Sequence, residues 1–422
     1  MKLRYSLFLS LLLILLFSCK HDHKHGPGGH DHAGHDHSGH DHSGHDHAGH
    51  DHAGHDHAGH DHSGHDHAGH DHAGHDHAGH DHSSHDAKPS NLKADLTYPG
   101  EVHLKNLKQL TFGGDNAEAY WSFDDKNLVF QAKNEKWNAP CDQIYLEDFK
   151  RDRKSIPPLL STGKGRTTCS YFMPDNKHVL YASTHLWDEK CPPEPPRGDK
   201  YVWPIYESFD IFVADLDGNI IKQLTDGSGY DAEATVSPNG DKIVYTSTSS
   251  GDLELWTMDI DGSNKKQVTS GLGYDGGAFF SPDGSKLVFR SSRPKSEAEI
   301  KEYKDLLAQG LVQPTSMELY VCNVDGSELK QVTNLGKANW APFYHPSGKK
   351  IIFSSNHESE KGFPFNLYMI NEDGTGLEQI TFDEAFDSFP MFSFDGKKLA
   401  FSSNRNNGGG RSTNMFVADW VE

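Results

Sequence analysis

Short stretches rich in β-branched and aromatic residues recur through the chain after residue 100, separated by polar turns. Residues 286–291 and 350–355 are clear examples, in which apolar side chains follow a lysine and end in serines. Such stretches, about six residues long and bounded by Gly, Pro, Asn, Asp and Ser, are typical of β-strands. The pattern therefore predicts an all-β domain over residues 101–422.

The turns between these stretches repeat. A four-residue turn motif occurs six times, at 122–125, 173–176, 237–240, 281–284, 345–348 and 393–396. A strand follows each copy, then a third strand such as 318–324. In four repeats an Asp-Gly turn comes next, and a short strand ends at Thr225, Thr269, Thr333 or Thr381. Four antiparallel strands per repeat form the blade of a β-propeller, so we expect six blades.

The two ends of the repeat region indicate how the ring closes. The sixth repeat stops after its third strand at 414–420, while an unattached strand at 107–111 precedes the first repeat. We expect this N-terminal strand to complete the last blade, which would hide two exposed sheet edges. The turns and the Lys-Gln-Leu-Thr strand ends resemble the TolB-type, or WD40-like, propeller repeat over 101–422. The resemblance implies the fold and leaves the activity open.

The N-terminus reads as an export signal. Lys2 and Arg4 precede an apolar run at 7–17 that is too short to span a bilayer as a helix. The following Ser18-Cys19 resembles the end of a bacterial lipobox, with Phe17 where a small residue is usual. We predict a signal peptide at 1–18 and a lipid anchor on Cys19; the alternative is an ordinary secretory signal. The predicted location is the cell envelope, lipid-anchored at the outer membrane, on its periplasmic or surface face.

A tether at 19–100 separates this anchor from the domain. From His30 the unit His-Asp-His-(Ala/Ser)-Gly repeats eleven times, with Ser84 in place of Gly in the last copy and without an apolar side chain larger than Ala. Such a segment cannot repay the entropy of ordering, so we expect disorder. Neighbouring imidazoles can bind Zn, Ni or Cu; the alternative is a hydrophilic spacer. The candidate ligands are His30, His32, His35, His37, His40, His42, His45, His47, His50 and His52.

Charge and motifs restrict the function. The net charge of −21 argues against nucleic acid as a partner. No G-x-S-x-G elbow, H-E-x-x-H helix or phosphate-binding loop occurs in the sequence. We therefore predict a monomeric binding module for an envelope protein or peptide, which contacts the membrane through its lipid anchor. The alternative is a metal-dependent lyase or lactonase-like enzyme that acts on a carbohydrate or lactone.

The insertions indicate the working face. First-to-second and third-to-fourth turns are expected to be short, while the opposite face carries insertions at 134–142, 185–208, 295–309, 357–364 and 404–413. Loops that vary on a rigid scaffold commonly carry function. Counting along each repeat brings polar residues to the strand ends on this face. The binding-face candidates are Asn116, Glu118, Thr167, Asp231, Glu233, Asp275, Arg293, Asn339, His357, Asp387 and Arg405.

These candidates allow two interpretations. Blades one to three appear acidic and blades four to six basic, and such a mouth suits a peptide terminus, a carboxylated sugar or a cation. Glu118, Asp231 and Glu233 are also a candidate hard-ion site. Alternatively, the Asp and Asn side chains cap the strand entrances and pair with Arg293 and Arg405 from blade to blade.

Four cysteines lie in the domain of this exported chain, where disulfides can form. Cys141 and Cys191 fall in insertions of adjacent blades on one face, so we predict that they are bonded. Cys169, at the entrance of an inner strand, is the rival partner. Cys322 lies mid-strand two blades away and is expected to be unpaired.

Overall fold

The computed structural model describes residues 96–195, 200–360, 362–384 and 386–422. The predicted signal peptide, Cys19 and the tether up to residue 95 lie outside the described residues. No helix in the described ranges is long and apolar enough to cross a membrane.

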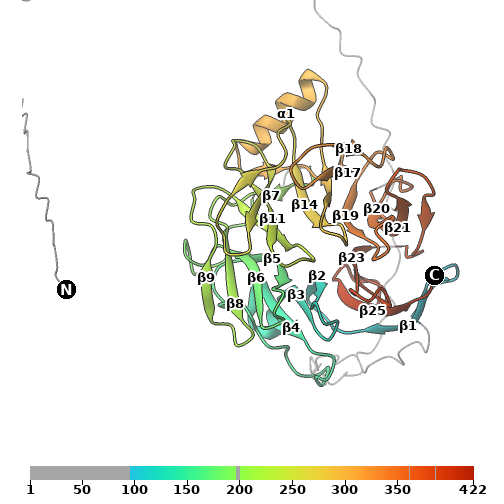
Figure 1. Ribbon diagram of the computed structural model, residues 1–422. Coiled ribbons are helices and arrows are strands. Elements are labelled where there is room, and N and C mark those ends of the chain that lie inside the picture. The colour runs from blue at the N-terminus through green and yellow to red at the C-terminus, as the bar shows by residue number, and fades with distance from the viewer. Residues whose placement is uncertain (1–95, 196–199, 361, 385) are drawn as a thin grey trace, which may run out of the picture. The chain divides into compact units, whose positions relative to one another are not determined.

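Six antiparallel sheets surround a central axis, and their first strands contact one another in a ring (Figure 1). This confirms the predicted six-bladed propeller. Four blades have four strands in chain order from the axis outward. They are β5 (Thr167–Phe172), β6 (His178–Ser183), β8 (Asp210–Asp215) and β9 (Ile220–Gln223); β10 (Asp231–Val236), β11 (Lys242–Ser247), β12 (Glu254–Asp259) and β13 (Lys266–Gln267); β14 (Asp275–Phe280), β15 (Lys286–Ser291), β17 (Glu318–Asn323) and β18 (Lys330–Gln331); and β19 (Asn339–Tyr344), β20 (Lys350–Ser355), β21 (Asn366–Asn371) and β22 (Glu378–Gln379).

The second strand of each blade is buried on both faces, because neighbouring blades cover it. In blades two to six every residue of this strand after the first is buried. That is why these strands read as continuous apolar runs. An aromatic side chain at the centre of each, 2% exposed or less, packs in the core: Phe130, Tyr181, Tyr245, Phe289, Phe353 and Phe401.

The last blade is closed by the N-terminal strand, as predicted. β1 (Leu104–Gln109) pairs antiparallel with β25 (Asn414–Trp420), which continues into β24 (Lys398–Ser403) and β23 (Asp387–Phe392). Just before β1, the carboxylate of Glu101 pairs with the Arg405 guanidinium at 3.0 Å, and both side chains are almost fully buried. The strand is therefore held by a backbone ladder and by an ion pair inside the blade.

The first blade departs from the predicted pattern in two ways. It consists of β2 (Asp115–Trp121), β3 (Leu128–Asn134) and β4 (Ala139–Glu147), and its fourth strand is a single bridge between Tyr145 and Leu159. Most of the insertion predicted at 134–142 is a short 3-10 helix, η1 (Glu135–Trp137), followed by β4 itself. A long loop at 148–158 instead joins β4 to Leu159. The expectation that all third-to-fourth turns are short was wrong here.

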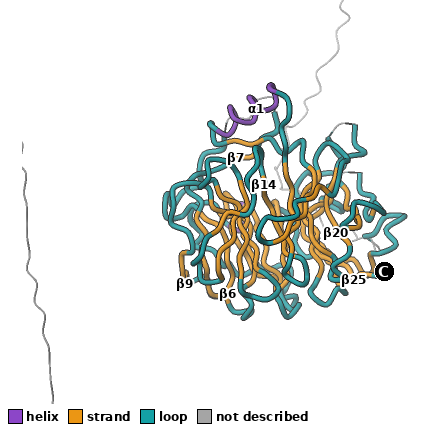
Figure 2. The backbone as a smooth tube through the Cα atoms, turned by 45° about the horizontal axis from the view of Figure 1, so that its top comes forward, coloured by secondary structure: helices purple, strands orange, loops and turns teal. Residues whose placement is uncertain are grey.

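The opposite face carries the remaining large insertions. The blade-four insertion forms α1 (Glu297–Leu307), which begins with a capping box between Ser296 and Glu299. It continues into β16 (Leu311–Val312), which pairs with β7 (Trp203–Pro204) from the blade-two insertion. Figure 2 shows α1 and β7 at the same end of the propeller. We call this end the insertion face.

Candidate functional site

A pocket of about 450 Å³ lies at the propeller axis and opens toward the insertion face. Every first strand contributes at least one residue to its lining. The lining residues at the equivalent position of the six first strands, which we call the ring residues, are Glu118, Cys169, Glu233, Gly277, Ala341 and Phe389.

A bulge in each first strand brings the ring residues to the pocket. All six have a positive φ between 42° and 59°, and the strand register shifts at the same place in every blade. A bulge of this kind re-aims a side chain that regular pleating would direct elsewhere. Counting along the repeats found the equivalence of the six positions, but gave no signal for the bulge.

Glu233 is fully engaged in a buried network. Its Oε1 accepts hydrogen bonds from the hydroxyls of Tyr230 (3.3 Å) and Tyr274, and from Arg290 Nη2 (2.8 Å). Its Oε2 accepts from Thr246 Oγ1 (3.0 Å) and from the Gly277 amide (2.6 Å). Burial, the largest single effect, lowers the pKa of the Arg290 guanidinium, but the Glu233 carboxylate together with Tyr274, Cys169 and Tyr230 raises this pKa above its usual value. The two charges therefore neutralise each other inside the protein.

Arg290 also stacks on aromatic rings. Its guanidinium carbon lies 5.2 Å from the ring centre of Trp203 and 5.1 Å from that of Tyr274, within cation–π range. Arg290 is not among the residues predicted for the binding face, although the sequence carries a signal for it. It follows the central aromatic of β15, where the other second strands have only uncharged residues: Gln131, Ala182, Thr246, Ser354 and Ser402.

Glu118 differs from Glu233 because few groups stabilise its negative charge. Its Oε2 accepts one hydrogen bond, from the Tyr120 hydroxyl at 3.3 Å. Burial raises the pKa of Glu118 to about 7; a hydrogen bond with Cys169 opposes the shift, and the Glu233 charge adds to it. Burial and the Glu118 charge also raise the pKa of the Cys169 thiol well above its usual range. Glu118 therefore titrates near neutral pH.

Aromatic side chains form most of the remaining wall. Trp203 and Tyr201 come from the blade-two insertion, and Trp340 follows the entrance of β19. The ring centres of Trp203 and Trp340 are 5.2 Å apart, and the Trp340 Nε1 donates to the Pro314 carbonyl at 2.8 Å. The other aromatic lining residues are Tyr120, Tyr206, Phe209, Tyr230, Tyr274, Phe279, Phe386 and Phe389.

Most of the strand-entrance candidates do not line this pocket. Asn116, Asp275, Asn339 and Asp387 are fully buried, and Asp231 is 8% exposed. Asn339, for example, donates to the backbone carbonyls of Met317 and Gly336. Among the entrance residues, Thr167 does line the pocket, and its hydroxyl donates to the Asp142 carbonyl at 3.0 Å. The capping interpretation describes the first group.

The charged candidates pair inside blades. Arg293 binds Asp275 through two hydrogen bonds of 2.5 and 2.9 Å, and Arg405 binds Asp387 at 2.6 Å. Each pair joins a first strand to the end of the second strand of the same blade, so the predicted pairing from blade to blade was wrong. His357 lies away from the pocket and hydrogen-bonds Ser355 Oγ at 3.0 Å.

Two further predictions about the binding face, the acidic half and the hard-ion site, need correction. Arg166 lines the pocket at the entrance of blade two, so the predicted acidic half of the mouth carries a cation. Among the described residues no group of three or more His, Cys, Asp or Glu side chains is placed to hold a metal ion. The candidate hard-ion site of Glu118, Asp231 and Glu233 is therefore not assembled, because Asp231 stays at its strand entrance.

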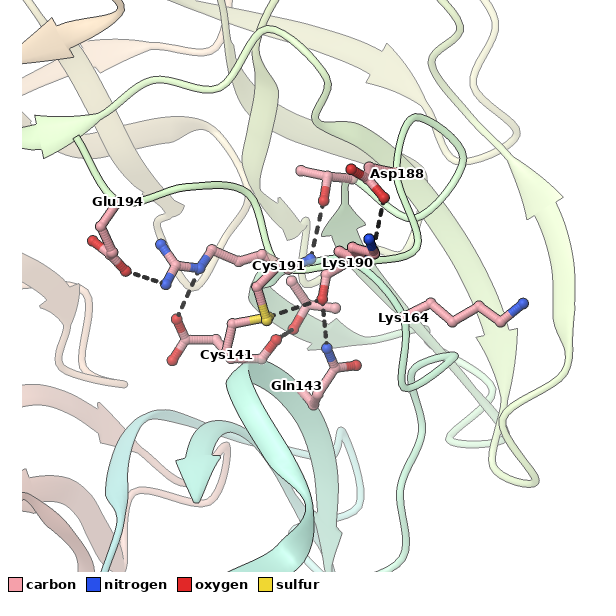
Figure 3. The surroundings of a disulfide bond; sticks show 12 residues. Cys141, Gln143, Lys164, Asp188, Lys190, Cys191 and Glu194 are labelled. Atoms are coloured by element: carbon pink, nitrogen blue, oxygen red, sulfur yellow. Dashed lines mark hydrogen bonds and ion pairs between the residues drawn. A yellow bond between two sulfur atoms is a disulfide. The ribbon is translucent and has the colours of Figure 1, made fainter. Parts of the chain in front are cut away.

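The predicted disulfide is present. Cys141 and Cys191 are bonded with a Cα–Cα distance of 5.9 Å (Figure 3). Cys169 and Cys322 are free. The bond ties the blade-two insertion to β4 of blade one. Beside it, the Gly165 carbonyl accepts a hydrogen bond from Gln143 Nε2 at 2.8 Å. One end of the insertion that carries Trp203 is therefore fixed covalently.

The fold and the pocket define a six-bladed β-propeller with a ligand-sized cavity at its axis. Residues 196–313 match the family model described as the TolB beta propeller domain. This match agrees with the resemblance that the repeat motifs carry.

Solved structures with related folds include two of TolB. A putative TolB from Agrobacterium tumefaciens is 18% identical, with 73% of this chain and 91% of that chain covered and a TM-score of 0.47. TolB from Acinetobacter baumannii is 18% identical, with 74% and 64% covered and a TM-score of 0.43. An oligogalacturonate lyase from Vibrio parahaemolyticus is 12% identical, with 74% and 93% covered and a TM-score of 0.43. No curated protein matches the chain.

Proposed function

We propose that this protein is an envelope binding module whose propeller holds a segment of a protein or peptide in the central pocket. The main support for this proposal is the pocket itself, which is about 450 Å³ in volume and is lined by aromatic side chains around a few polar groups. Concave, largely apolar sites with a small number of convergent polar groups are typical of ligand binding. The volume suits two or three side chains of an extended peptide.

A metal-dependent lyase or lactonase is the alternative. Such an enzyme needs three or four converging donor side chains at the axis. In the described ranges the pocket offers Glu118 alone as a carboxylate without a cationic partner, since Glu233 is held by Arg290. This arrangement favours binding over metal-assisted catalysis.

The pocket is tested by filling it. Ala341 and Phe389 occupy equivalent bulges with φ of 46° and 55°, so the backbone at Ala341 accepts a phenylalanine. We expect Ala341→Phe to abolish binding of peptides that the mature protein selects from a random peptide library, while its melting temperature stays close to that of the parent. Phe389→Ala, which enlarges the pocket, is the matched variant. Peptides bound equally by the parent and Ala341→Phe would contradict the proposed site.

The proposal includes a lipid anchor on Cys19 and a location at the outer membrane. The support is the apolar run followed by Ser18-Cys19. Cys19→Ser should release the protein from the membrane fraction of its host and remove acyl chains from the N-terminal peptide in mass spectrometry. A variant that stays in the membrane fraction would argue against this anchor.

We also propose that the tether binds Zn, Ni or Cu through its paired histidines. Neutral imidazole binds these ions and protonated imidazole does not, so affinity should fall steeply below about pH 6. Calorimetric titration of the mature chain with zinc, at about pH 7.5 and 5.5, measures this. The chain without residues 20–88 is the control. Equal zinc uptake by both chains would leave the tether as a spacer.

A further inference from the structure

The charges that line the pocket do not balance. Glu233 is neutralised by Arg290 at 2.8 Å. Arg166 pairs with Glu194 and lies 3.6 Å from Asp142. Glu118 has no Lys, Arg or His partner among the described residues, and its hydrogen-bond donors are the neutral Tyr120 hydroxyl and Cys169 thiol. One carboxylate is therefore left uncompensated.

The walls around this carboxylate suit a cation. Tyr120 lies on the same strand, and Trp203, Tyr230, Tyr274 and Trp340 line the same cavity. Aromatic faces attract ammonium groups through their quadrupoles, and the attraction grows as water is excluded. The Arg290 guanidinium already makes such cation–π contacts with Trp203 and Tyr274. A ligand cation would meet both a ring surface and a counter-charge.

We infer that the pocket recognises its ligand through a cationic nitrogen, a primary ammonium group of a peptide N-terminus or lysine side chain, bound by the Glu118 carboxylate between aromatic rings. This rests on the proposed peptide-binding function and names the group that is recognised. Charge-assisted hydrogen bonds to a carboxylate are about twice as strong as neutral ones. An anionic ligand is disfavoured, because both arginines at the pocket are already paired and Glu118 would repel it.

Protonation couples to this recognition. The groups that face Glu118 are Tyr120 on β2, Cys169 on β5, Glu233 on β10 and Arg290 on β15. Tyr120 and Cys169 stay neutral at physiological pH, since burial raises the pKa of each. Arg290 stays charged and is paired with Glu233. Between about pH 5 and 8, Glu118 is therefore the group whose loss of charge weakens cation binding as the pH falls.

Three small probes that share an indole ring test the charge preference on the full mature protein: tryptamine, N-acetyltryptamine and indole-3-propionate. Calorimetry at about pH 8 should show tryptamine binding at least tenfold more tightly than the acetylated probe, with no detectable binding of the anion. Glu118→Gln should remove the preference for tryptamine. Glu297→Gln, an exposed change in the first turn of α1, should leave it intact. Melting curves check that both variants fold.

A second arm uses a tripeptide with a free amino terminus, its N-acetylated form, and the acetylated form with one lysine. Tighter binding of the first or third identifies the source of the ammonium group. Selective tryptamine binding without any peptide binding would support cation recognition and contradict the peptide-binding function. Peptide binding that ignores acetylation, or a Glu118→Gln variant that keeps the preference for tryptamine, would overturn the inference. Failure of all probes to bind would overturn it as well.

Discussion

Gly277 is the one ring residue without a side chain, and the reason lies on the neighbouring strand. A Cβ at this position would stand 1.8 Å from Arg290 Nη1. Backbone conformation does not require glycine, because Ala341 and Glu233 adopt similar positive φ values of 46° and 58° in other blades. Glycine is needed so that the guanidinium can lie across the bulge and reach Glu233.

Gly277→Ala should therefore displace Arg290 from Glu233 and lower the free energy of unfolding by about 3 kcal/mol, the lower range for breaking a buried ion pair. Urea unfolding measures this. Gly113→Ala is the control, because Gly113 also has a positive φ (85°) but no atom lies within 4 Å of its added Cβ. It should lose about 1 kcal/mol from backbone strain. Equal losses in the two variants would contradict the steric argument.

Glu118 makes stability depend on pH in a definite direction. Its pKa rises from the ordinary value of 4.5 to about 7 in the folded protein, so the folded state binds this proton more tightly than the unfolded chain. The contribution is fully present at low pH and is lost as the pH rises through 7. Glu118→Gln should gain stability relative to the parent between about pH 5 and 8. Melting temperatures of both proteins at the two pH values test this, and parallel curves would refute it.

Some of the site was predictable at this scale and some was not. The six strand entrances follow from counting, since turn and strand lengths repeat; Glu118 and Glu233 were found in this way. The bulges were not predictable, because glutamate, cysteine and phenylalanine carry no preference for positive φ. Without the bulge, sequence spacing could not separate Glu118, which faces the pocket, from Asn116, which caps a strand.

Among the elements, the blade-two insertion is secured at two places. Cys191 is bonded to Cys141 on β4, and β7 pairs with β16 of the blade-four insertion. Trp203 belongs to β7, so both attachments act on the segment that contributes rings to the pocket. This arrangement accounts for how an irregular insertion can present side chains in fixed positions.

The Cys141→Ser, Cys191→Ser double variant should lose about 4 kcal/mol of unfolding free energy, as the chain-entropy estimate gives for cysteines 50 residues apart. Urea unfolding with and without dithiothreitol measures the loss. The parent should respond to the reductant and the double variant should not. The matched control is Cys322→Ser, which keeps the response to dithiothreitol. A parent that is insensitive to reduction would contradict a stabilising disulfide.

The irregular first blade shows where element prediction stops. Its fourth strand is a single bridge, and the loop at 148–158 is held by the buried Glu147, which pairs with Arg151 at 2.9 Å and with Arg153. A motif search finds the copies of a repeat, but it does not reveal that one copy lacks a strand. Tertiary ion pairs between a strand end and a loop leave no periodic pattern in the sequence.

The closed propeller depends on the pairing of its first and last strands, β1 and β25. Deleting residues 101–111 removes β1 and Glu101 and exposes the edge of β25. We expect that chain to aggregate, because an unpaired strand edge recruits other chains. Deleting residues 20–88 should leave the melting temperature of the metal-free protein nearly unchanged. Light scattering and calorimetry compare the two, and a soluble, equally stable chain without 101–111 would contradict the closure argument.

At this scale the sequence was most informative. The sequence contains six copies of one turn motif, lacks the last strand of the sixth repeat and has a surplus strand before the first. Because every blade packs against its neighbours in the same way, these features together specify a closed ring. β7, which lines the pocket, is held by its pairing with β16, a contact between insertions two blades apart. That contact occurs once, so no repetition reveals it.

Ring closure also sets an order of events in time. β1 leaves the ribosome first, and its partner β25 follows about 300 residues later. Bringing such distant segments together costs loop entropy and slows folding. Until β25 is made, β1 has no partner and the outer edge of β24 is unpaired, so the propeller can be completed only after synthesis is nearly finished. This order would help a chain that crosses a membrane unfolded, because the propeller cannot close before the last strand has been made.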